Sequence, residues 1–242
     1  SMPAPKYTIA EQEQLILDAA VQCVLDSSLI DFKMSDIAKN AGLSMGSVYK
    51  HIQSKEDVLV ALSVRIDKQA SNVIREVLEL PYSLPTKIVA IHLVSQEAMY
   101  TYSFSYQLLT MLNSKDLLAK SSEKWLMKLA LVSKEIRCLF QESLRAAVEE
   151  EELLCSDEEK ESLIEEFMLL HWALNIGFPQ ILNHPYDTYI NEARTNVNVP
   201  LTLTHPLVRA AVRMTNSYPW KKAISTEELE EIEQVLIERG LR

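Results

Sequence analysis

Residues 32–62 read FKMSDIAKNAGLSMGSVYKHIQSKEDVLVAL, and they are the most informative stretch of the chain. Apolar residues recur there at helical spacing on both sides of Gly42, a residue type that ends helices readily because it adopts left-handed backbone angles at little cost. Ser44 follows as a candidate N-cap. The pattern predicts two short helices, over 35–41 and 44–52, joined by a tight turn.

The apolar residues of this stretch predict a small common core, formed by Ile37, Ala41, Leu43, Val48 and Ile52. If the second helix buries Val48 and Ile52, its remaining side chains lie mainly on other faces. Those faces carry Met45, Ser47, Tyr49, Lys50 and His51. The result is a donor-bearing helix surface of the size that the DNA major groove admits.

The charge of this stretch also differs from that of its surroundings. Residues 33–55 hold four lysines and one aspartate, a net charge of +3, in a chain whose formal net charge is −10. A basic island in an acidic protein is a possible electrostatic footprint for nucleic acid, although a weak one on charge alone.

Helical spacing continues through the rest of the chain. A capping box at Thr8 and Glu11 predicts the first helix start, and we expect further helices over 54–80, 122–149, 156–182, 207–216 and from 225 onward. Between them, 86–112 is apolar and aromatic with breaks, and 183–206 is irregular. The predicted fold class is all-α, with a helix-turn-helix three-helix domain at 1–56 and a larger helical domain at 57–242.

Composition excludes several classes of protein. Of the 242 residues, 48% are hydrophobic and 24% are charged, which is typical of a globular chain. The three cysteines are far apart and form no CxxC pair, so neither a disulfide framework nor a zinc ribbon is expected. No apolar run approaches the ~18 residues of a membrane span. We therefore expect a soluble, cytoplasmic protein that does not act at a membrane.

Motifs of catalysis and cofactor binding are missing from the sequence. The five histidines show no HExxH or comparable ligand spacing, and there is no GxSxG, P-loop or dinucleotide-binding fingerprint. We expect neither an enzyme, nor a cofactor, nor a metal site.

Residues 32–62 resemble the DNA-binding region of the TetR (tetracycline-repressor-like) family of bacterial transcriptional regulators. Four elements at the family's spacing carry the resemblance: Asp36-Ile37-Ala38, Ala41-Gly42-Leu43-Ser44, Tyr49-Lys50-His51 and Ser54-Lys55-Glu56. The remaining part of the chain shows no matching motif, in a region where the family diverges in sequence and stays helical.

The resemblance implies roles for particular residues. Positions that look into the major groove are matched by Met45, Gly46, Ser47 and Tyr49, and positions that hold phosphates by Tyr49, His51 and Lys55. Lys33 and Ser35 fall at the start of the second helix, where Lys33 replaces a capping Thr. Because Met45 and Gly46 offer few hydrogen bonds, base readout is expected to rest on Ser44, Ser47 and Lys50.

For the larger domain the resemblance implies dimerisation and a small-molecule pocket. The candidate lining residues are Tyr100, Phe104, Trp125, Phe167, His171 and Asn175. Aromatic residues at helical spacing also form ordinary cores, and this reading stays open for all of them. An acidic domain favours an apolar or cationic effector over an anion. The helix predicted over 156–182 is apolar nearly all round, so it is the candidate, paired with one of the C-terminal helices, for a four-helix dimer interface.

These expectations combine into one hypothesis and two alternatives. The hypothesis is a homodimeric repressor of transcription that binds a pseudo-palindromic operator and is released by a small-molecule effector. The first alternative is a DNA-tethered protein whose helical domain binds a protein partner instead. The second is a helical enzyme that carries the motif by chance.

Overall fold

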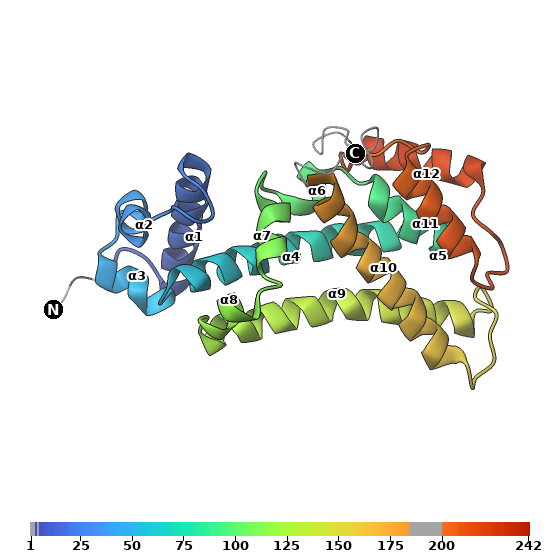
Figure 1. Ribbon diagram of the computed structural model, residues 1–242, viewed down its shortest axis with the longest axis horizontal. Coiled ribbons are helices and arrows are strands. Elements are labelled where there is room, and N and C mark those ends of the chain that lie inside the picture. Colours follow the sequence, from blue (N-terminus) through green and yellow to red (C-terminus); the bar gives the residue numbers. More distant parts are fainter. Residues whose placement is uncertain (1–2, 4, 184–199) are drawn as a thin grey trace. The chain divides into compact units, whose positions relative to one another are not determined.

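The computed structural model describes residue 3, residues 5–183 and residues 200–242 (Figure 1). Its elements are α1 (Ile9–Asp26), α2 (Met34–Ala41), α3 (Met45–His51), α4 (Lys55–Leu78), α5 (Leu84–Ala90), the short 3-10 helix η1 (Ile91–Leu93), α6 (Gln96–Tyr100), α7 (Ser105–Met111), α8 (Lys115–Ala119), α9 (Glu123–Glu149), α10 (Lys160–Asn183), α11 (Pro206–Asn216) and α12 (Thr226–Glu238). Over these ranges the only extended pairing is an isolated bridge between Leu153 and Trp220. The all-α class is confirmed, and no described helix is long and apolar enough to cross a membrane.

The chain packs into two compact units. The first comprises residues 1–67 and 104–132, and the second comprises 68–103 and 133–242. The long helices α4 and α9 each contribute residues to both units. The predicted division of function, with DNA binding at 1–56 and the remaining roles at 57–242, stays a prediction.

Local capping signals place the helix starts of the first unit. The Thr8 hydroxyl accepts the Glu11 N–H at 3.1 Å, and the Glu11 carboxylate accepts the Thr8 N–H at 2.7 Å, so the predicted capping box is present at α1. Ser54 caps the first turn of α4, where its hydroxyl accepts the Asp57 N–H at 3.1 Å. Each signal acts within three residues, which is why the sequence alone predicted it.

Two expected segments differ in the structure. The hydroxyl of Ser156 accepts the Glu159 N–H at 3.3 Å, as a cap would, but residues 157–159 form a turn and α10 begins at Lys160. The stretch 86–112 divides into four short helical pieces, from α5 to α7. Most of the segment 183–206 predicted to be irregular, His184 included, lies outside the described residues.

The core of the first unit contains the predicted residues of the motif. Ile37, Val48 and Ile52 are fully buried, whereas Ala41 and Leu43 are half-buried. They share this interior with α1 through Ile16 and Ala20. Burying a large aliphatic side chain contributes about 1.5–3 kcal/mol, so this small core holds α2 and α3, which are too short to persist alone, against α1.

The second unit is built around α5, which packs against α11 and α12. One of its apolar clusters joins residues of α4, α5, α11 and α12. A second cluster joins α5 and α9 with α10 and the segment after α11, through residues such as Leu144, Phe167 and Trp220. The buried side of α10 therefore faces its own unit, and its other side is described below.

Candidate nucleic-acid interface

The turn between α2 and α3 has the geometry of a helix C-cap followed by a new N-cap. Gly42 adopts φ +67°, the left-handed region, and its N–H bonds back to the Lys39 carbonyl at 3.2 Å. The Leu43 N–H reaches the Ala38 carbonyl at 3.1 Å, which completes the cap of α2. The two helices are thereby held at a defined angle by backbone bonds as well as by the core.

Ser44 then starts α3. Its hydroxyl accepts the Ser47 N–H at 3.1 Å and donates to the Ser47 hydroxyl at 3.0 Å. Ser44 is therefore occupied in capping, while the Ser47 hydroxyl retains its own proton to donate outward. Of the two serines expected to read bases, Ser47 is the better placed.

The outward face of α3 carries apolar, aromatic and basic groups together. The exposed fraction is 36% for Met45 and 44% for Tyr49, and Gly46 and Lys50 are exposed as well. Met45 and Tyr49 are four residues apart, so their side chains are neighbours on this face of the helix. The face combines contact for thymine methyl groups with donors for base edges or phosphates.

The basic residues that flank this face differ in their exposure and in their contacts with the protein. Lys33 and Ser35, at the start of α2, are exposed, and Lys33 occupies the N-cap position without a side-chain capping bond. The Nζ atom of Lys55 donates to the Ile30 carbonyl at 2.6 Å and lies 4.5 Å from the centre of the Phe32 ring. The charge of Lys55 is therefore held beside the loop that precedes α2.

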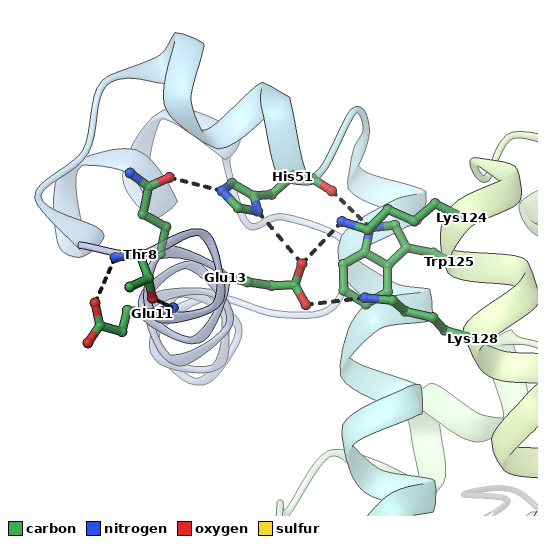
Figure 2. Close-up of polar contacts among 8 residues, drawn as sticks. Thr8, Glu11, Glu13, His51, Lys124, Trp125 and Lys128 are labelled. Carbon is green, nitrogen blue, oxygen red and sulfur yellow. Dashed lines mark hydrogen bonds and ion pairs between the residues drawn. The ribbon is translucent and has the colours of Figure 1, made fainter. Parts of the chain in front are cut away.

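His51 is buried, although the sequence pattern predicted it on a face of its helix away from the core. Its exposed fraction is 6%, because the last turn of α3 directs the ring against α1. There Nε2 lies 3.0 Å from the Gln12 Oε1 atom, and Nδ1 lies 3.6 Å from the Glu13 carboxylate (Figure 2). The ring is engaged by protein groups on both nitrogens, so its assignment to a phosphate contact remains only a prediction.

Glu13 lies at the centre of this polar cluster. Its carboxylate contacts the Nζ atoms of Lys124 and Lys128, at 3.1 and 3.4 Å, and both lysines come from the start of α9 (Figure 2). Burial opposes ionisation of the carboxyl, but the hydrogen bonds and charges of the two lysines outweigh it and lower its pKa. Glu13 is therefore a carboxylate that joins α1, α3 and α9.

Trp125, one of the ligand candidates, lies beside Glu13 in the first unit (Figure 2). It is 2% exposed, and its Nε1–H donates to the His51 carbonyl at 2.9 Å. Phe104 also belongs to the first compact unit, whereas Tyr100, Phe167, His171 and Asn175 belong to the second. Trp125 is buried, as an aromatic residue of an ordinary core would be, and no sequence pattern indicated its partner.

The ligand candidates of the second unit have different surroundings. His171 is buried, with Nε2 at 3.3 Å from the Thr215 hydroxyl and its ring centre 4.4 Å from that of Phe167. Burial lowers the pKa of His171 to about 4, so the ring is neutral near pH 7. Tyr100 is half-buried, and Asn175 is exposed.

Hollows in the second unit lie elsewhere. One of 390 Å³ is lined by Ser95, Glu97, Ala98, Pro200, Gly240 and Arg242, and one of 210 Å³ by Gln96, Glu97, Thr101, Tyr102 and Ser103. None of the six ligand candidates lines either hollow. Among the described residues, no group of three or more His, Cys, Asp or Glu side chains is placed to hold a metal ion.

Comparison with known proteins agrees with the helix-turn-helix geometry. Residues 16–62 match the family described as bacterial regulatory proteins of the tetR family. Over these residues the chain is similar to the TetR family. A Bacillus subtilis (strain 168) relative, the fatty acid metabolism regulator protein, is 38% identical over 58 residues, which are 24% of this chain and 27% of the relative. The chain thus matches about a quarter of the length of that relative.

Several solved structures share the fold over most of the chain. Salmonella enterica GusR is 20% identical, with 86% of this chain and 95% of that chain covered, at a TM-score of 0.55. Reduced Escherichia coli NemR is 16% identical, with 88% of this chain and 99% of that chain covered, at a TM-score of 0.53. FadR from Bacillus subtilis, in complex with stearoyl-CoA, is 16% identical, with 84% of this chain and 95% of that chain covered, at a TM-score of 0.50. At these identities the likeness concerns the fold alone.

Proposed function

We propose that this protein is a transcriptional regulator, a repressor that binds a pseudo-palindromic operator as a homodimer and leaves it when a small-molecule effector binds. The observation that carries the proposal is the outward face of α3, where Met45, Tyr49 and Lys50 stand exposed on a helix fixed by Gly42 and Ser44. In the second copy of a symmetric dimer, the same face would enter a second major groove, one helical turn away.

The homodimer is supported by α10. Its exposed side carries Leu169 and Trp172, with exposed fractions of 59% and 64%, followed by Ile176 at 38%. These residues recur at intervals of three and four, so they form one stripe along the helix. A stripe of this kind on the surface of a monomer is typical of an interface with another chain.

The effector is supported by the chemistry of the second unit. The unit is acidic and its interior is apolar with isolated polar groups such as His171 and Thr215, which suits an apolar or cationic molecule. The Bacillus subtilis FadR structure contains stearoyl-CoA, whose acyl chain is apolar and whose head group is anionic. Stearoyl-CoA is therefore a useful first probe. If it binds, the pocket requires an apolar chain and tolerates an anionic head group, whereas binding of a quaternary ammonium compound alone would show that the pocket requires positive charge.

Selection of random and genomic duplexes by the purified chain tests DNA binding. We expect an enriched inverted repeat whose affinity falls steeply with salt, by about 0.9 logarithmic unit per neutralised phosphate for each logarithmic unit of salt. Adding stearoyl-CoA or a quaternary ammonium compound should release the repeat if either has the effector's chemistry. Failure to enrich any sequence at low salt would contradict the proposal and favour the alternative of a helical enzyme.

Three variants then divide the roles of the lysines. Lys55→Ala should weaken binding to all duplexes and should reduce the slope of log affinity against log salt by about 0.9, the value for one lost phosphate contact. Lys50→Ala should weaken binding to the selected repeat alone. Lys39→Ala is the control, because Lys39 is an exposed lysine of α2 outside the candidate set. Equal effects of all three changes would show that only overall charge matters, and would contradict the assigned contacts.

A further inference from the structure

The first two turns of α9 pack in the same compact unit as the helix-turn-helix, although 74 residues separate Trp125 from His51. His51 is the last residue of α3, and the carbonyl groups at a helix C-terminus have no partner within the helix. The Trp125 indole supplies one, at 2.9 Å, from a buried position (Figure 2). A side chain of α9 thus caps the end of the recognition helix.

The orientation of the indole is itself fixed by neighbours. The Nζ atoms of Lys124 and Lys128 lie 4.8 and 4.4 Å from its ring centre, so both ammonium groups make cation–π contacts with it. Both ammonium groups are also held by Glu13 on α1. Because Glu13 also lies 3.6 Å from His51, its carboxylate links the two lysines to the last residue of α3.

A second attachment lies at Ser122, the residue that directly precedes α9. Asp57, which is fully buried at the start of α4, accepts the Ser122 N–H at 2.6 Å and the Gln53 N–H at 3.0 Å. The start of α9 is therefore bonded to the turn between α3 and α4 by a carboxylate, and to α3 by an indole. Bonds that involve a charged acceptor are the stronger kind.

The contacts of Trp125 and Glu13 converge on the C-terminal end of α3, a helix too short to be stable without them. α3 has seven residues, and isolated helices of this length are not stable in water. Tyr49 and Lys50 lie on the same last turn as His51, so any shift of the His51 carbonyl moves them too. Operator recognition depends on such side chains to within a fraction of an ångström.

We propose that Trp125 and Glu13 are positioning residues for DNA recognition: through His51 they set the placement of Tyr49 and Lys50. This inference rests on the proposed function of α3 as the recognition helix. It assigns α9 to the DNA-reading apparatus as a fourth structural element, beyond the three helices of the motif.

The test compares specific with non-specific binding by the full-length chain. Affinity is measured for the enriched repeat and for a shuffled duplex of equal length, and their ratio is compared between variants. Trp125→Phe removes the donor and keeps a ring in place, and Glu13→Gln removes the charge at constant size. A residue that only stabilises the fold changes the concentration of active protein, which affects both duplexes alike and leaves the ratio unchanged.

We expect the ratio to fall about three- to tenfold in Trp125→Phe, the equivalent of one hydrogen bond, and roughly threefold in Glu13→Gln. Two controls should stay within about twofold of the wild type. Asp18→Asn breaks an ion pair with Arg65 at 2.7 Å in the same unit, and Met127→Ala truncates an exposed residue of α9. Ratios in both Trp125→Phe and Glu13→Gln that match those of the controls would overturn the inference.

Amide hydrogen exchange of the free chain separates this inference from the proposed function. Trp125→Phe should accelerate exchange of the amides of residues 48–53 and leave those of α2 unchanged. If the wild type enriches no duplex, the proposed function fails, and the exchange rates alone decide whether α9 holds α3 in place. Unchanged exchange at residues 48–53 would then overturn the inference.

Discussion

The imidazole rings of His92 and His171 stack in the second unit with their centres 6.3 Å apart. Loss of hydration lowers the pKa of each ring to about 4, and the proximity of His92 adds to the effect on His171. Both rings are therefore neutral near pH 7, and His171 contacts the Thr215 hydroxyl in that state. The pair links η1 to α10, the helix proposed to form the dimer interface.

Acid should therefore destabilise the protein through these histidines. Their pKa in the folded chain is lower than the value of about 6.5 in an unfolded chain. The stability that they contribute is present above about pH 6.5 and is lost as the pH falls towards 4, by at most about 3 kcal/mol for each ring. Denaturant unfolding at pH 7 and pH 5 measures the loss. His92→Asn should reduce the difference between the two pH values, and an undiminished difference would contradict the assignment.

Asp67 should act in the opposite direction. Loss of hydration raises the pKa of its carboxyl to about 6, above the ordinary value of about 3.9 for an unfolded chain. The stability associated with the neutral carboxyl is present below about pH 4 and is lost as the pH rises through 6. Asp67→Asn should therefore raise the free energy of unfolding by about 1–3 kcal/mol at pH 7 and change it little at pH 4. An equal change at both pH values would count against a buried charge at this position.

Two glycines of the motif should respond oppositely to the same substitution. A Cβ atom at Gly42 meets no atom within 4 Å, but φ is +67°, so Gly42→Ala should cost about 1–2 kcal/mol of backbone strain. Gly46 lies within α3, and its Cβ would approach only the Ser44 hydroxyl, at 3.9 Å. Gly46→Ala should therefore stabilise by about 0.5–1 kcal/mol. Thermal or denaturant unfolding of both variants gives the comparison, and changes of the same sign would refute it.

The α10 stripe should control the oligomeric state. Trp172→Glu places a charge in the centre of the proposed interface, where the dimer would bury it without a partner, so dimer dissociation should increase by at least about tenfold. Sedimentation velocity over a range of concentrations measures the change. Met127→Glu, at a residue 59% exposed on α9 in the first unit, is the control and should leave the distribution unchanged. Trp172→Glu protein that remains dimeric would place the interface elsewhere.

Local features of the fold could be predicted because their causes lie within a few residues of one another. The caps at Thr8 and Ser44 and the left-handed Gly42 each act within one turn of backbone, and the apolar spacing correctly indicated the burial of Ile37, Val48 and Ile52. The start of α10 was placed too early because a serine cap can also close a turn that stands before a helix.

The partners in the candidate site could not be predicted in this way. The pattern placed His51 on the outward face, and only the packing of α3 against α1 showed that Gln12 and Glu13 hold it. The Trp125 indole donates to the His51 carbonyl at the end of α3, a contact that no sequence pattern indicated, and its predicted place in a ligand pocket stays a prediction. A linear sequence shows the period of a helix and the residues that cap it, so it determined the class of fold and the recognition motif. Which side chain meets which across 39 or 74 residues depends on how whole helices pack, and that was decided by the tertiary structure alone.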